Sequence, residues 1–171
     1  MKLARTLIAG AALVIASASA AGAADLLKPV PADPIYSSSL FNFDGLYVGG
    51  TAGLSSWGTS VGVVVGSNFA VTDGIIIGGE FQGDIYFNSG VTAYDALALG
   101  RVGGFIADNV MLYGDAGMGL LNSSPVYALG IGAEMGLGGN LGVRGDLQGL
   151  GAFGASPSGT RATVGLMWHM N

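Results

Sequence analysis

The chain has 171 residues, of which 50% are hydrophobic and only 10% are charged, and it contains 32 glycines and no cysteine. Soluble domains carry about 25% charged residues, so this composition argues against a typical soluble domain. Without cysteine no disulfide can hold the fold together, so burial and backbone hydrogen bonding must do so.

The first 23 residues have the layout of a secretory signal peptide. Lys2 and Arg5 precede an apolar run over residues 7–15, and small residues follow up to Ala23, after which we expect cleavage. An uncleaved anchor helix is the weaker alternative, because the apolar run is shorter than the roughly 20 residues of a membrane span. Cleavage removes two of the six basic residues and leaves four against eleven acidic ones, a net charge of −7. This charge argues against nucleic acid or an anionic membrane surface as a partner.

Residues 24–43 contain three of the five prolines and no sustained periodicity, so we predict an extended periplasmic leader there. Residues 44–171 are predicted to form one β-barrel. Runs of about ten to thirteen residues alternate with short stretches rich in Gly, Asn, Ser and Asp, which are typical of hairpin turns. The predicted strands cover residues 45–55, 61–71, 75–87, 92–105, 110–120, 126–137, 141–150 and 161–170.

The predicted strands alternate between an apolar wall and a polar wall. In residues 75–87, IIIGGEFQGDIYF, the odd positions are apolar or glycine, whereas the even positions include Glu80, Gln82 and Asp84. Successive side chains of a strand point to opposite faces, so each strand has one apolar face. Every strand that holds two charged residues carries both on the same face. The nine charged residues in strands are Glu80, Asp84, Asp95, Arg101, Asp115, Glu134, Arg144, Asp146 and Arg161.

The remaining question is which wall faces water. A soluble sandwich or barrel would show many Lys, Glu and Thr on its outer face, whereas the chain after residue 23 has a single lysine, Lys28, outside the strands. No later stretch is apolar enough for a helical span, so membrane insertion requires strands. The sequence predicts an all-β fold, an eight-stranded antiparallel transmembrane up-and-down β-barrel with its charged residues in the lumen. A soluble secreted barrel that binds an apolar ligand is the alternative.

One strand fits this pattern less well. Over residues 92–105, Leu97 and Leu99 share the face of Asp95 and Arg101, which allows a β-bulge in this strand. On the apolar wall, aromatic residues near strand ends fit the girdles at membrane interfaces. They are Phe69 and Trp168 at one rim and Phe87 and Tyr127 at the other.

The sequence gives little evidence of catalysis. His169 is the only histidine, and a catalytic interpretation would make it the base of an outer-membrane lipid hydrolase. We favour a lumen or interface histidine, because no serine is evident near it in the predicted topology. The acidic strand residues are scattered over different strands without a loop motif, so we predict no metal, no cofactor and no small-molecule substrate.

Several short motifs resemble a known family. The segment FDGLYVGG at residues 43–50, the start Ala24-Asp25-Leu26, and Gly100-Arg101-Val102-Gly103 followed by Tyr113 are similar to the small outer-membrane β-barrel surface proteins of alphaproteobacteria. The resemblance implies an eight-stranded barrel in the outer membrane, with both termini periplasmic. It also implies a structural or porin-like surface protein, with outer-membrane lipid and, during insertion, the β-barrel assembly machinery as partners.

Overall fold

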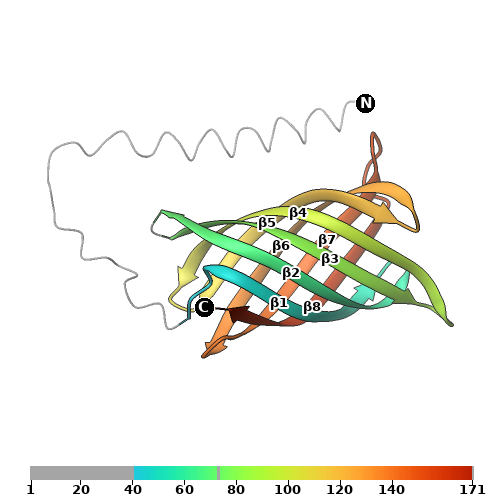
Figure 1. The fold of residues 1–171 in the computed structure, drawn as a ribbon. Coiled ribbons are helices and arrows are strands. Elements are labelled where there is room, and N and C mark those ends of the chain that lie inside the picture. Colours follow the sequence, from blue (N-terminus) through green and yellow to red (C-terminus); the bar gives the residue numbers. More distant parts are fainter. Residues whose placement is uncertain (1–40, 73, 171) are drawn as a thin grey trace, which may run out of the picture. The chain divides into compact units, whose positions relative to one another are not determined.

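The computed structural model describes residues 41–72 and 74–170. The predicted signal peptide and most of the predicted leader lie outside these residues. The described chain forms one closed barrel of eight strands, each hydrogen-bonded to its sequence neighbours, and β8 closes the barrel on β1 (Figure 1). The strands are β1 (Gly45–Ser55), β2 (Gly58–Thr72), β3 (Ile75–Phe87), β4 (Val91–Ala107), β5 (Val110–Leu121), β6 (Ser124–Gly138), β7 (Leu141–Ala152) and β8 (Gly159–Met170).

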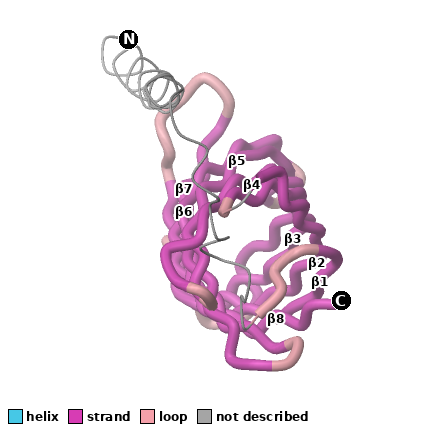
Figure 2. Tube along the Cα trace, turned by 90° about the vertical axis from the view of Figure 1, so that its left-hand side faces the viewer, coloured by secondary structure: helices cyan, strands magenta, loops and turns pink. Residues whose placement is uncertain are grey.

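This architecture confirms the predicted fold class and the eight predicted strands. All eight neighbouring pairs are antiparallel, and the β1 and β8 ladder runs without a shift from Leu46 opposite Met170 to Ser55 opposite Arg161. A closed sheet has no edge strand, so each strand has a hydrogen-bonded neighbour on both sides. The view of Figure 2 shows the strands running around the barrel wall. Within the described ranges, no helix is long and apolar enough to cross a membrane.

The two ends of the barrel are distinct. Because the number of described strands is even, β1 begins and β8 finishes at one end, here named the termini end. The opposite end, named the far end, carries the connections 56–57, 88–90, 122–123 and 153–158. The shifts in pairing register lie close to strand ends, for example between Ala70 and Thr72 and between Gly136 and Gly138.

The strand predicted with a bulge is regular in its centre. Strand β4 pairs with β3 without a shift from Ala93 to Gly104, so Leu97 and Leu99 both point into the lumen. They pack there against Val126, Ala128 and Leu150. The two leucines therefore share the face of the charged residues because one side of the lumen is apolar, and the predicted bulge is absent from this stretch.

The exterior wall is apolar. Among the described residues, the large exposed hydrophobic side chains lie on the outward face of every strand, and they include Phe81 at 69% exposure and Ile131 at 65%. All charged residues of the described strands have the opposite orientation. A soluble barrel would bury this apolar wall and expose the charges, so the exterior has the character of a lipid-facing surface.

Candidate functional site in the barrel lumen

The nine charged residues predicted to face the lumen all point into the barrel, and most of them form two clusters. The termini-side cluster lies nearer the termini end, and the far-side cluster lies nearer the far end. The first comprises Tyr47, Glu80, Arg101, Glu134, Arg144 and His169. The second comprises Asp84, Tyr86, Asp95, Gln148 and Arg161.

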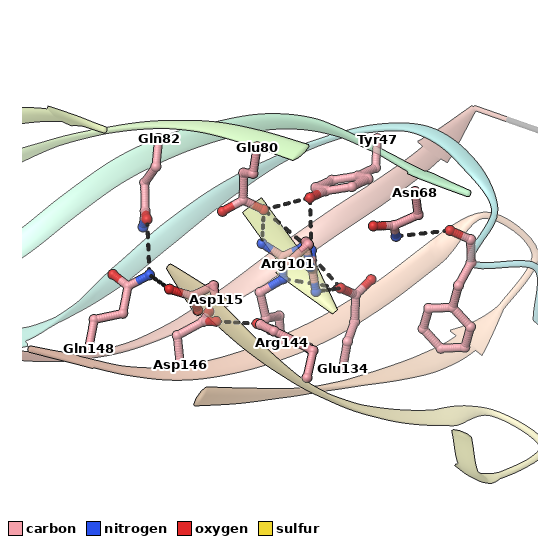
Figure 3. Close-up of polar contacts among 12 residues, drawn as sticks. Tyr47, Asn68, Glu80, Gln82, Arg101, Asp115, Glu134, Arg144, Asp146 and Gln148 are labelled. Atoms are coloured by element: carbon pink, nitrogen blue, oxygen red, sulfur yellow. Dashed lines mark hydrogen bonds and ion pairs between the residues drawn. The ribbon is translucent and has the colours of Figure 1, made fainter. Parts of the chain in front are cut away.

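In the termini-side cluster, two arginines hold two glutamates. Arg144 donates from Nη1 to Glu80 Oε2 at 2.6 Å and from Nε to Glu134 Oε2 at 3.1 Å. Arg101 lies 3.4 Å from Glu80 and 3.7 Å from Glu134, so each carboxylate faces both guanidinium groups (Figure 3). Four charges from β3, β4, β6 and β7 thus balance one another across the lumen, where an uncompensated charge would be costly.

Tyrosine rings complete this cluster. Tyr47 donates to Glu80 Oε2 at 2.6 Å and accepts from Arg101 Nη1 at 2.8 Å. The guanidinium carbon of Arg101 lies 3.8 Å from the ring centroid of Tyr113, and that of Arg144 lies 5.0 Å from the centroid of Tyr47. Planar guanidinium groups stack well on aromatic faces, so both arginines are fixed by packing as well as by charge.

The far-side cluster is built around one arginine. Arg161 donates from Nη1 to Asp84 Oδ2 at 2.6 Å and to Asp95 Oδ2 at 2.9 Å, and from Nη2 to Gln148 Oε1. Tyr86 donates to the same Asp95 oxygen at 2.5 Å. Strands β3 and β4 place Asp84 opposite Asp95, so the two carboxylates share a single cation.

Two further carboxylates are held by neutral groups. Asp115 accepts from Gln148 Nε2 at 3.1 Å, and Asp146 accepts from the Tyr113 hydroxyl. Among the described residues, six carboxylates and three guanidinium groups therefore face the lumen. No group of three or more metal-ligating side chains with suitable geometry occurs among these residues.

Glycines on the lumen face make room for these side chains. A Cβ atom at Gly62 would lie 2.2 Å from Asp84 Oδ1, and one at Gly66 would lie 2.3 Å from the Tyr47 hydroxyl. A Cβ at Gly132 would lie 2.3 Å from Tyr113 Cζ. The lumen of an eight-stranded barrel is just wide enough for side chains to fill, so glycine at these three positions leaves space for Asp84, Tyr47 and Tyr113.

Apolar groups fill both ends of the lumen. At the termini end, Phe41 and Phe43 pack with Ile76, Met111 and Tyr113. Toward the far end, Trp57 packs against the cluster that contains Leu97 and Leu150, and its ring lies 5.4 Å from that of Tyr86. Charged clusters and apolar groups together occupy the lumen along its length.

His169 lies in the termini-side cluster and is fully buried. Its Nε2 atom is 2.6 Å from Glu134 Oε1, and its ring lies 5.0 Å from Phe41 and 5.4 Å from Tyr47. This histidine therefore contacts a carboxylate and packs against two aromatic rings.

The four aromatic residues predicted for interfacial girdles lie near strand ends. Phe69 and Trp168 are exposed near the termini end, and Phe87 is exposed at the far end. Tyr127 is half-buried, and its hydroxyl donates to Ala155 O at 2.8 Å. Their contact with the edges of a bilayer remains a prediction.

Sequence reasoning did not assign three tyrosines and Gln148 to the lumen network. Tyr47, Tyr86, Tyr113 and Gln148 contact the charged groups directly. Tyr86, Tyr113 and Gln148 lie an even number of positions from the charged residues of their strands, so they share the inward face. Strand β1 has no charged residue, and Tyr47 shares the face of most of its glycines instead. The sequence signal that could have identified them is the presence of tyrosine or glutamine on the same face of the strand as the charged residues or glycines.

The closed topology, the apolar exterior and the polar lumen define the class of eight-stranded antiparallel barrels of the outer-membrane type. No protein-family model matches the sequence. No curated protein matches it either.

Among solved structures, the chain is similar to the N-terminal β-barrel domain of Pseudomonas aeruginosa OprF, with TM-score 0.58 and 11% identity over 74% of this chain and 98% of that one. A barrel from the de novo design of transmembrane β-barrels matches with TM-score 0.54 and 18% identity, over 75% and 98% of the two chains. The Yersinia pestis outer membrane protein Ail matches with TM-score 0.50 and 12% identity, over 74% and 100%. These similarities concern the fold.

Proposed function

We propose that the protein is a structural barrel of the bacterial outer membrane, with a sealed lumen and no catalytic activity. The observation that carries the proposal is the combination of an apolar exterior with a lumen filled by two ion-pair clusters and by apolar groups at both ends. Eight strands enclose a space that side chains can fill, whereas water-filled pores need about sixteen.

The far end supports a structural role. Its longest connection comprises residues 153–158, and none of the described residues in its connections is charged. Such short loops offer little surface for a large partner. Outer-membrane lipid is the proposed environment of the apolar wall, and the β-barrel assembly machinery is the proposed partner during insertion.

Membership of the small surface barrels of alphaproteobacteria is part of the proposal. It is supported by the motifs at residues 43–50 and 100–103, which fall in or beside β1 and in β4. The same proposal includes export by the signal peptide at residues 1–23 and a periplasmic leader. N-terminal sequencing of the envelope-bound protein tests this part, and a start at Ala24 is expected.

Two alternatives are less well supported. A soluble barrel with an apolar ligand would need a wettable exterior, which the exposed Phe81, Ile131 and Val164 contradict. A lipid hydrolase based on His169 would need an imidazole that is accessible to substrate, whereas this ring is buried and contacts Glu134.

Conductance in planar bilayers tests the sealed lumen. Purified monomer should give no steady, protein-dependent current, and the N-terminal β-barrel domain of OprF can serve as a fold-matched comparison. A deletion in the source bacterium tests the structural role, because loss of an envelope component should raise sensitivity to detergent. Steady conductance of the pure monomer, or hydrolysis of outer-membrane lipid by it, would contradict the proposal.

A further inference from the structure

A short segment that precedes β1 closes the termini end of the lumen. Phe41 and Phe43 were assigned to the leader by sequence, yet they are only 2% and 1% exposed and lie inside the barrel. Their ring centroids are 4.7 Å apart in an edge-to-face arrangement. We name these two side chains the aromatic plug.

Hydrogen bonds to the end of β2 help to hold the segment in place. Asn68 Nδ2 donates to the backbone oxygen of Phe43 at 3.0 Å, and Ala70 N donates to Asp44 Oδ1 at 2.9 Å. The Asn68 side chain is drawn in Figure 3 with its bond to this segment. Every barrel strand, by contrast, pairs with a neighbouring strand on both sides. Residues 41–44 precede both ladders of β1, so the segment can leave without breaking the pairing of any strand.

A glycine of strand β6 leaves space for the ring of Phe41. A Cβ atom at Gly136 would lie 2.1 Å from Phe41 Cγ, so this position accepts the ring only because it is glycine. The backbone of Gly136 is fixed in turn by Asn109, since Gly136 N donates to Asn109 O at 2.8 Å and Asn109 Nδ2 donates to Gly136 O at 3.1 Å. The space for the Phe41 ring thus belongs to the barrel wall.

The plug covers the imidazole of His169. The ring of His169 lies 5.0 Å from Phe41 and 5.8 Å from Phe43, both at nearly perpendicular angles. Its Nε2 atom contacts Glu134, and its Nδ1 atom has no hydrogen-bond partner among the described residues. Because β8 finishes at Met170, this imidazole lies at the termini end, directly behind the plug.

We infer that the termini end of the lumen is a binding site for the chain's own Phe41-Asn42-Phe43, which acts as a removable plug over the His169 and Glu134 pair. The plug detaches while the barrel stays closed, because residues 41–44 take no part in the strand ladders. Its release uncovers an aromatic pocket and a carboxylate–imidazole pair, but opens no pore, since the two charged clusters still fill the lumen beyond it.

Chemical modification of His169 tests this inference, because the chain has one histidine. The full-length protein is folded in detergent and treated with diethyl pyrocarbonate, and the modified imidazole is followed by ultraviolet absorbance and confirmed by mass spectrometry. The double variant Phe41→Ala/Phe43→Ala should react at least about tenfold faster than the wild type, as a locally opened site does. The exposed exterior variant Phe81→Ala is the control and should react at the wild-type rate.

A second pair of variants keeps both plug rings. Gly136→Ala fills the space that the Phe41 ring occupies and should also accelerate the modification of His169. Gly145→Ala is the control and should leave the rate unchanged, because its added Cβ would lie 4.0 Å from the nearest neighbouring atom. All variants are first shown to keep the gel mobility of the unheated barrel. Equal modification rates in the wild type, the double variant and Gly136→Ala would overturn the inference, as would acceleration by Gly145→Ala to the same extent.

Discussion

The substitution Arg144→Leu tests the lumen network at a residue that joins two glutamates. Arg144 is 2% exposed, and it contacts Glu80 at 2.6 Å and Glu134 at 3.0 Å. Removing one partner of a buried ion pair costs about 3–5 kcal/mol, because the other charge is left uncompensated. Here Arg101 stays within 3.4 Å of Glu80 and 3.7 Å of Glu134, and His169 still contacts Glu134. The loss should therefore fall near the lower limit, about 3 kcal/mol.

Urea unfolding from lipid vesicles, followed by tryptophan fluorescence, measures this free energy. Leu147→Ile is the matched control, because Leu147 lies on the same strand, faces outward and is 54% exposed. The control should change the free energy of unfolding by less than about 0.5 kcal/mol. A change of that small size for Arg144→Leu would refute the assignment of the charged wall to a sealed lumen.

The same unfolding assay checks three further predictions. Leu147→Arg, in the middle of the exterior wall of β7, should cost about 2–4 kcal/mol, and Val143→Arg, nearer the strand end, should cost less; equal costs would contradict the membrane placement. Gly132→Ala should cost about 1–3 kcal/mol, because its Cβ would lie 2.3 Å from Tyr113, whereas Gly145→Ala should be nearly neutral. Arg161→Leu should cost about 3–5 kcal/mol, and adding Asp95→Asn should recover part of this loss, since Asp84 and Asp95 share that arginine. No recovery would show that the carboxylates are already neutral.

The strands were predictable because their pattern is local. A period of two with one apolar wall follows from the geometry of a strand, and it located all eight strands to within a few residues. The orientation of Arg144 or Glu80 also follows from parity alone. The partner of each charge does not, because contacts such as Arg144 with Glu80 cross the lumen between β7 and β3 and depend on the closure of the barrel.

The apolar parts of the lumen were harder to predict. Leu97 and Leu99 break the alternation of polar and apolar residues in β4, since they pack against other inward-facing apolar groups rather than lipid. Phe41 and Phe43 stand next to a proline-rich stretch with no strand periodicity, so their burial could not be read from local sequence. Both cases need the three-dimensional packing of side chains from separate strands.

Quenching of tryptophan fluorescence by brominated lipid acyl chains tests most directly whether the apolar wall faces lipid. The chain has two tryptophans, Trp168 on the exterior wall and Trp57 packed against the lumen cluster. The variant Trp57→Phe, which keeps Trp168, should lose most of its fluorescence in vesicles of brominated lipid. The variant Trp168→Phe, which keeps Trp57, should lose little. Strong quenching of Trp57 with none of Trp168, or no quenching of either, would contradict a membrane-spanning barrel with its apolar wall in the bilayer.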